Sequence, residues 1–231
     1  MKKILKVIVP SVVCLFAVVF GALCLGFSSC EKAKPLSDYV SELRSDLFEG
    51  SSEKYALKAA YGFKEKPLLN DGKIGEKIYS LSFVLLNAPA DDVSRSVVFS
   101  FNDKDYRATF KYNPASDAVT ASFETENFNL KSFDVKIVCG ADAETVTLNS
   151  VMPENTLSWN AALDVLSIKQ SELVGAYKNE NGDFTGEIAQ RIIVKNGKPY
   201  WYVGLMNGNG SVKALLIDGE KGEILAVREI F

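Results

Sequence analysis

The strongest constraint on the fold is an alternation of apolar and polar residues across residues 54–152. The segment "YALKAAYGF" places every second side chain from Tyr55 to Phe63 on one face, and "IYSLSFVLL" does the same from Tyr79 to Leu85. A period of two is typical of strands that are buried on one side. About seven such runs, separated by turn residues, predict an antiparallel β-sandwich of immunoglobulin-like architecture. The architecture alone implies no function.

The first 30 residues predict a signal peptide or membrane anchor. A basic head precedes an uncharged apolar run from Val7 to Phe27, and Cys30 follows in "FSSC". This pattern resembles that of bacterial lipoproteins, which implies cleavage before Cys30 and attachment of lipid to it. The alternative is that residues 1–30 remain as an uncleaved anchor. In both cases the positive charges stay in the cytoplasm, so the rest of the chain is expected on the extracytoplasmic face of the membrane.

Composition narrows the classes of function. Without residues 1–29 the chain has 23 basic and 29 acidic residues, so its body has no electrostatic affinity for nucleic acid. The chain contains no histidine, which removes the commonest general base and metal ligand. Cys139 is the one cysteine after Cys30, and we interpret it as a buried strand residue. The sequence predicts no catalytic residues and no cofactor.

Residues 31–53 predict a polar tether followed by a helix over residues 37–50. Ser37 is a suitable N-cap, and Gly50 suits the position after the last turn. Four apolar residues recur at helical spacing, namely Leu36, Val40, Leu43 and Leu47. We expect this helix to pack on a sheet, or alternatively to recruit a partner.

Acidic residues in turns are the candidate metal ligands. Asp91 and Asp92 are adjacent, and Asp103 and Asp105 lie in "NDKD", a predicted hairpin loop. A calcium ion needs several converging oxygens, whereas two nearby acids more often point apart into solvent. The segment 177–188 resembles a calcium loop in part but lacks its first and last acidic ligands. No metal site is predicted.

The C-terminal residues 153–231 change period and predict a helix followed by four strands. Ser158 is the expected N-cap, and a second short helix is expected from Ser171. Four apolar runs then follow, joined by turns such as Asn196–Gly197 and "DGEKG". They predict a four-stranded antiparallel sheet with the helix on one face. The whole chain is therefore expected to be α+β.

This C-terminal pattern resembles the PepSY module of bacterial surface and secreted proteins over residues 157–231. The matching residues are Trp201, Val203, Ile217, Asp218, Gly222, Glu223, Ile224 and Leu225. The family is similar to propeptide segments of secreted metallopeptidases. The resemblance implies a binding module outside the cell, suspected of restraining a peptidase, and brings no catalytic residues.

The sequence therefore favours an extracytoplasmic, membrane-anchored binding or regulatory protein, not an enzyme. Its expected partners are the membrane, through the lipid or apolar segment, and a peptidase or another envelope protein. One alternative is a structural surface lipoprotein without a specific ligand. Another is a glycan hydrolase, which would need two converging carboxyl groups in a cleft.

Overall fold

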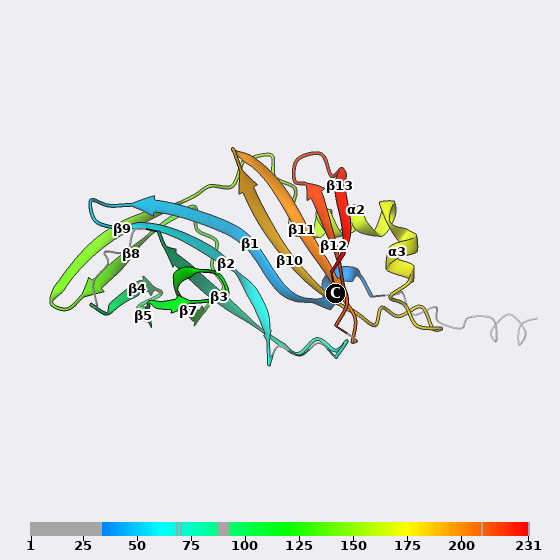
Figure 1. Ribbon diagram of the computed structural model, residues 1–231, viewed down its shortest axis with the longest axis horizontal. Helices are drawn as coiled ribbons and strands as arrows, with labels where there is room; N and C mark the ends of the chain where they lie inside the picture. Colours follow the sequence, from blue (N-terminus) through cyan, green and yellow to red (C-terminus); the bar gives the residue numbers. More distant parts are fainter. Residues whose placement is uncertain (1–33, 68, 70, 87–92, 209, 231) are drawn as a thin grey trace, which may run out of the picture. The chain divides into compact units, whose positions relative to one another are not determined.

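The computed structural model describes residues 34–231, except residues 68, 70, 87–92, 209 and 231 (Figure 1). Of the described residues, 57% lie in strands and 11% in helices, and the strands are mostly antiparallel. The predicted α+β class is therefore wrong, because helices form only a small part of a β structure. No helix among the described residues is long and apolar enough to cross a lipid bilayer.

The first nine strands form a nearly closed, barrel-like sheet. Their order is β6-β7-β3-β2-β1-β9-β8-β4-β5, and every neighbouring pair in this order is antiparallel. The strands are β1 (Val40–Ser51), β2 (Ala56–Lys66), β3 (Glu76–Leu85), β4 (Arg95–Phe101), β5 (Lys104–Thr109), β6 (Lys111–Asn113), β7 (Ala118–Thr125), β8 (Ser132–Cys139) and β9 (Asp142–Ser150).

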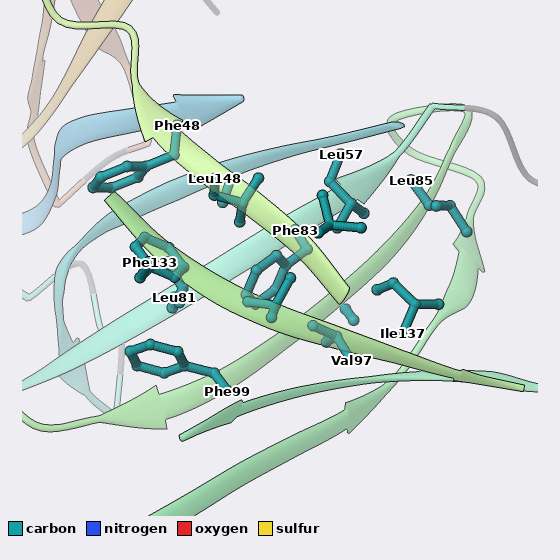
Figure 2. Packing of buried hydrophobic residues seen from close by; sticks show 14 of the residues in the cluster. Phe48, Leu57, Leu81, Phe83, Leu85, Val97, Phe99, Phe133, Ile137 and Leu148 are labelled. Atoms are coloured by element: carbon teal, nitrogen blue, oxygen red, sulfur yellow. The ribbon is translucent and has the colours of Figure 1, made fainter. Parts of the chain in front are cut away.

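The inner faces of these strands supply an aromatic core (Figure 2). Phe133 of β8 lies between Phe48 of β1 and Phe99 of β4, with ring centroids 4.9 and 5.0 Å apart respectively. Leu81 and Phe83 of β3 are fully buried beside them. The predicted alternation of residues 55–63 and 79–85 is confirmed, because the buried side chains are the ones that the pattern placed on one face. The predicted hairpin at residues 102–105 is also confirmed.

The β-sandwich predicted for residues 54–152 is wrong. Phe48 pairs with Ser150, and Glu49 pairs with Asn149, so β1 and β9 join the two halves into one sheet. A period of two identifies strands and their buried faces. It does not specify which strand edges pair, and that choice separates a sandwich from a barrel.

The helix predicted over residues 37–50 is also wrong. Leu36–Tyr39 forms one short 3-10 helix (η1), and the chain then continues as β1. In this strand the pairing register shifts twice, once after Val40 against its parallel neighbour and once after Arg44 against β2. Each extra residue moves the alternation forward by one position. Val40 and Leu43 are therefore both buried on one face of a strand, three residues apart, which imitates helical spacing.

The C-terminal part has helices on one face of the continuing sheet. Its elements are α2 (Trp159–Lys169), α3 (Ser171–Gly175), β10 (Glu187–Lys195), β11 (Lys198–Met206), β12 (Val212–Asp218) and β13 (Ile224–Ile230). The predicted cap of α2 is confirmed, because the Ser158 hydroxyl accepts a hydrogen bond of 3.2 Å from the Ala161 amide. A second core lies under the helices, where the Trp201 indole donates to the Leu157 carbonyl at 2.9 Å.

The separate helix and four-stranded sheet predicted for residues 153–231 is a further error. The four strands do form the predicted meander, but β10 also pairs with β1, in parallel, from Val40 to Arg44. Strands β10 to β13 are thus one end of a thirteen-stranded sheet. Local turn signals predicted the hairpins, whereas nothing local indicates a partner strand near the start of the chain.

Candidate functional site

The sheet divides where β1 leaves β10 (Figure 1). The two strands pair until Arg44 lies beside Arg191, and β1 then shifts register against β2. From Phe48 onward the neighbour of β1 on this side is β9. Figure 1 shows β10 and β11, in orange, diverging here from β1, in blue. We call the space between the two branches the fork.

The fork leaves one edge of β10 without a neighbouring strand. Residues 192–195 pair with β11 on one side, and no described strand pairs with them on the other. In the β10–β11 hairpin, Val194 lies opposite Pro199, whose carbonyl accepts from Gly219 on the far side of β11. The N–H and C=O groups of one strand residue point the same way and alternate along the strand. The N–H and C=O groups of Ile192 and Val194 therefore point into the fork.

The fork contains an open cavity of about 520 Å³ whose walls are partly apolar and partly polar, the polar side chains being Glu49, Lys58 and Asn196. Its apolar lining residues are Leu47, Phe48, Ala59, Val151, Ile192, Ile193 and Val194. On the opposite wall, the Leu47 carbonyl already accepts from the Val151 amide at 3.0 Å, so that wall offers fewer free backbone groups. Ile193, one of the lining residues, is 37% exposed. The arrangement combines unpaired backbone groups with apolar side chains.

Basic residues surround the fork on the face of the sheet opposite the helices. At its closed end, Arg44 binds Glu42 at 2.9 Å, while the Arg191 guanidinium lies 4.4 Å from the centre of the Tyr202 ring. At its open end, Lys195 is exposed next to the Asn196–Gly197 turn. The rim is therefore more basic than the chain as a whole.

Two buried carboxyl groups lie elsewhere and hold the loop between β2 and β3. Glu187 accepts from the amides of Asp71 and Gly72 at 2.8 and 3.0 Å, and Glu65 accepts from Gly75 at 2.9 Å. Burial raises the pKa of Glu187, and the nearby charge of Glu65 raises it further. Neither side chain lines the three described cavities. Their oxygens bind backbone amides, which favours a structural role over acid–base catalysis.

The other predicted site residues give no second site in the described part of the chain. Cys30, with the whole predicted anchor, lies outside the described residues, as do Asp91 and Asp92. Asp105 accepts a hydrogen bond of 2.6 Å from the Ser100 hydroxyl, and Asp103 lies in the hairpin turn. No group of three or more acidic or cysteine side chains suited to a metal ion occurs among the described residues.

Sequence reasoning missed the fork. One signal was present: "RIIVK" places apolar residues on both faces of β10, which indicates that the second face is also covered or bound. No family model matches this chain, and neither the curated proteins nor the solved structures include a match.

Proposed function

We propose that this chain is an extracytoplasmic binding protein that captures an extended polypeptide segment in the fork. The segment adds as a strand to the free edge of β10, beside Ile192 and Val194. Such strand addition obtains affinity from main-chain hydrogen bonds and selectivity from pockets for alternate side chains. The observation that carries the proposal is that residues 192–195, which pair with no described strand on one side, line a cavity that also has apolar side chains.

The dimensions support a short strand. At about 3.3 Å per residue, residues 192–195 span roughly 13 Å, so the edge accommodates about four guest residues. Side chains of the guest that face the cavity would contact Leu47 and Val151. They would also contact Ile192 and Val194 of β10, whose side chains are on the helix-covered face of the sheet. An exposed edge next to apolar side chains is a site of unwanted association unless it has a partner. A specific guest gives this edge that partner.

The proposal retains three expectations from the sequence. The body lies outside the cytoplasmic membrane, held there through Cys30 or the apolar segment before it. The guest belongs to a peptidase or another envelope protein. The resemblance of residues 157–231 to the PepSY module also remains a prediction, and it agrees with a role in binding.

Backbone pairing can be tested with Val194→Pro. This substitution removes the N–H of residue 194, which points into the fork, and breaks no hydrogen bond to β11. The matched control is Val194→Thr, which keeps the amide and nearly the same shape. Full-length protein in detergent is titrated with fluorescent pentapeptides that are acidic, neutral or basic, each with and without backbone N-methylation. We expect unmethylated peptides to bind wild type and Val194→Thr, and Val194→Pro to bind at least tenfold more weakly.

Hydrogen exchange provides a readout that is independent of affinity. Bound peptide should slow exchange of the Ile192 and Val194 amides and leave barrel amides unchanged. Unchanged exchange at both residues on binding, or equal binding of N-methylated peptides, would contradict strand addition. Thermal unfolding of Val194→Pro establishes that its loss of binding does not come from loss of the fold.

A further inference from the structure

The side chains of β10 that face away from the helices follow a simple order. Arg191, Ile193 and Lys195 alternate with the inward residues Ile192 and Val194. A guest strand beside β10 has its own side chains on the same two faces. Its inward residues would meet apolar walls. Each of its outward residues would lie opposite or diagonal to a basic side chain.

Two basic side chains of β10 have no acidic partner among the described residues. None of the ion pairs among the described residues includes Arg191 or Lys195. Lys198, which pairs with Lys195 across the hairpin, adds a third positive charge at the open end. Like charges in neighbouring positions repel, so an arriving negative charge is favoured there.

The acidic residues near the fork are already engaged. Glu49 binds Lys58 at 2.8 Å, and Glu42 binds Arg44. Asp46 accepts a hydrogen bond of 2.6 Å from the neutral Ser45 hydroxyl and keeps its negative charge. Within the described residues 191–195 of β10, the unpaired charges are those of Arg191 and Lys195, and both are positive, although the chain has a formal net charge of −3.

We propose that the fork selects strands in which apolar residues alternate with Asp or Glu. This inference rests on the proposed capture of a strand and adds the chemical class of the guest. The apolar residues of the guest face Ile192 and Val194. Its carboxylates face outward, within reach of Arg191 and Lys195. A guest with lysine at the same positions places like charges together and binds more weakly.

The test compares Val-Glu-Val-Glu-Val with Val-Lys-Val-Lys-Val, both capped and fluorescent, on the full-length protein in detergent. Exposed charge pairs each change affinity by up to about fivefold. We therefore expect the acidic peptide to bind about tenfold more tightly at low ionic strength, and the difference to shrink as salt is added. The double variant R191E/K195E should reverse the preference.

The control variant is K131E/K136E, which makes the same change in net charge on the exposed surface of the barrel. It should keep the wild-type preference for the acidic peptide. If both peptides bind equally well, or if R191E/K195E does not alter the preference, the charge selection is wrong while strand capture stands. If no peptide of any charge binds, strand capture fails and the selection fails with it.

Discussion

The barrel-like part and the C-terminal part of the sheet use β1 in opposite ways. In the barrel, β1 lies between β2 and β9, and aromatic side chains such as Phe48 fill the interior. In the C-terminal part, helices cover one face, the other face is open, and the end of β10 has a neighbour on one side only. In the barrel, the N–H and C=O groups of β1 pair with strands of the same chain. Where β10 diverges from β1, the N–H and C=O groups on its free edge are available to a strand from another molecule.

The contrast shows that the aromatic packing of the barrel and the unpaired edge of β10 lie in different parts of the described sheet. The closed part is built from side chains that interlock across the barrel (Figure 2). In the C-terminal part, the apolar contacts lie between the helices and the sheet, whereas the free edge is that of β10 at residues 192–195. We therefore expect substitutions in the barrel to affect folding strongly, and substitutions at the fork to affect binding with little cost in stability.

The largest expected effect is in the barrel core. Phe99→Ala removes a side chain that is 1% exposed and touches Phe133, so it should lower the free energy of unfolding by about 3–5 kcal/mol. Equilibrium urea unfolding measures this change. Leu225→Ala on β13, where the side chain is 48% exposed, is the control and should stay within about 0.5 kcal/mol. Similar losses for both variants would contradict the contrast.

The next effect tests the strand that the two parts share. A Cβ at Gly62 of β2 would lie 1.9 Å from the Leu43 carbonyl oxygen, so Gly62→Ala must push β1 away from β2. We expect a loss of about 1–3 kcal/mol in unfolding free energy. Gly175→Ala is the matched control, because a Cβ there meets nothing within 4 Å and the residue ends a helix. Its stability should be equal to wild type or higher.

A smaller effect belongs to the helix-covered part alone. Ser158→Ala removes the N-cap of α2 and should cost about 1 kcal/mol. Hydrogen exchange should become faster in α2, while amides of β4 and β8 keep their wild-type rates. Faster exchange throughout the barrel would mean that the two parts open together, which would contradict the separation of the barrel from the helix-covered part.

The smallest effect is a pH dependence at the start of β10. Because burial raises the pKa of Glu187 above its ordinary value of 4.5, the folded state holds this proton more tightly than the unfolded chain. Its contribution to stability is therefore fully present below pH 4.5 and is lost as pH rises through the raised pKa.

Glu187→Gln keeps an oxygen for the amides of Asp71 and Gly72 but cannot titrate. Relative to this variant, the wild type should lose stability as pH rises across that interval. Urea unfolding of both proteins over a pH series gives the difference between their unfolding free energies. The titration of groups that the two proteins share cancels in this difference. A difference that stays constant with pH would rule out the raised pKa.

Local signals predicted much of the secondary structure. Alternation identified the buried faces of β2 and β3, turn residues placed the hairpins, and Ser158 marked the start of α2. The predicted Asp218 turn is confirmed too, since its carboxylate accepts from the amides of Glu220 and Lys221 at 2.9 and 2.8 Å. These features depend on residues close together in the chain, which is why one sequence reveals them.

The errors all involve partners that are distant in sequence. Bulges in β1 produced helical spacing, the β1–β9 pairing closed the barrel, and the β1–β10 pairing removed the boundary expected near residue 153. The fork results from the last two pairings together. Its residues were visible in the sequence as "RIIVK", but their position beside an unpaired edge depends on where β1 diverges.

The parallel pairing of β1 and β10 also bears on how fast the chain reaches its native state. Val40 can pair with Ile188 only after all the residues between them have been synthesised, and contacts so far apart in sequence are slow to form. Until then, the apolar side of β1 is exposed to water and to other nascent chains. A chain closed by such a pairing is expected to fold more slowly than one whose strands pair only with neighbours in sequence.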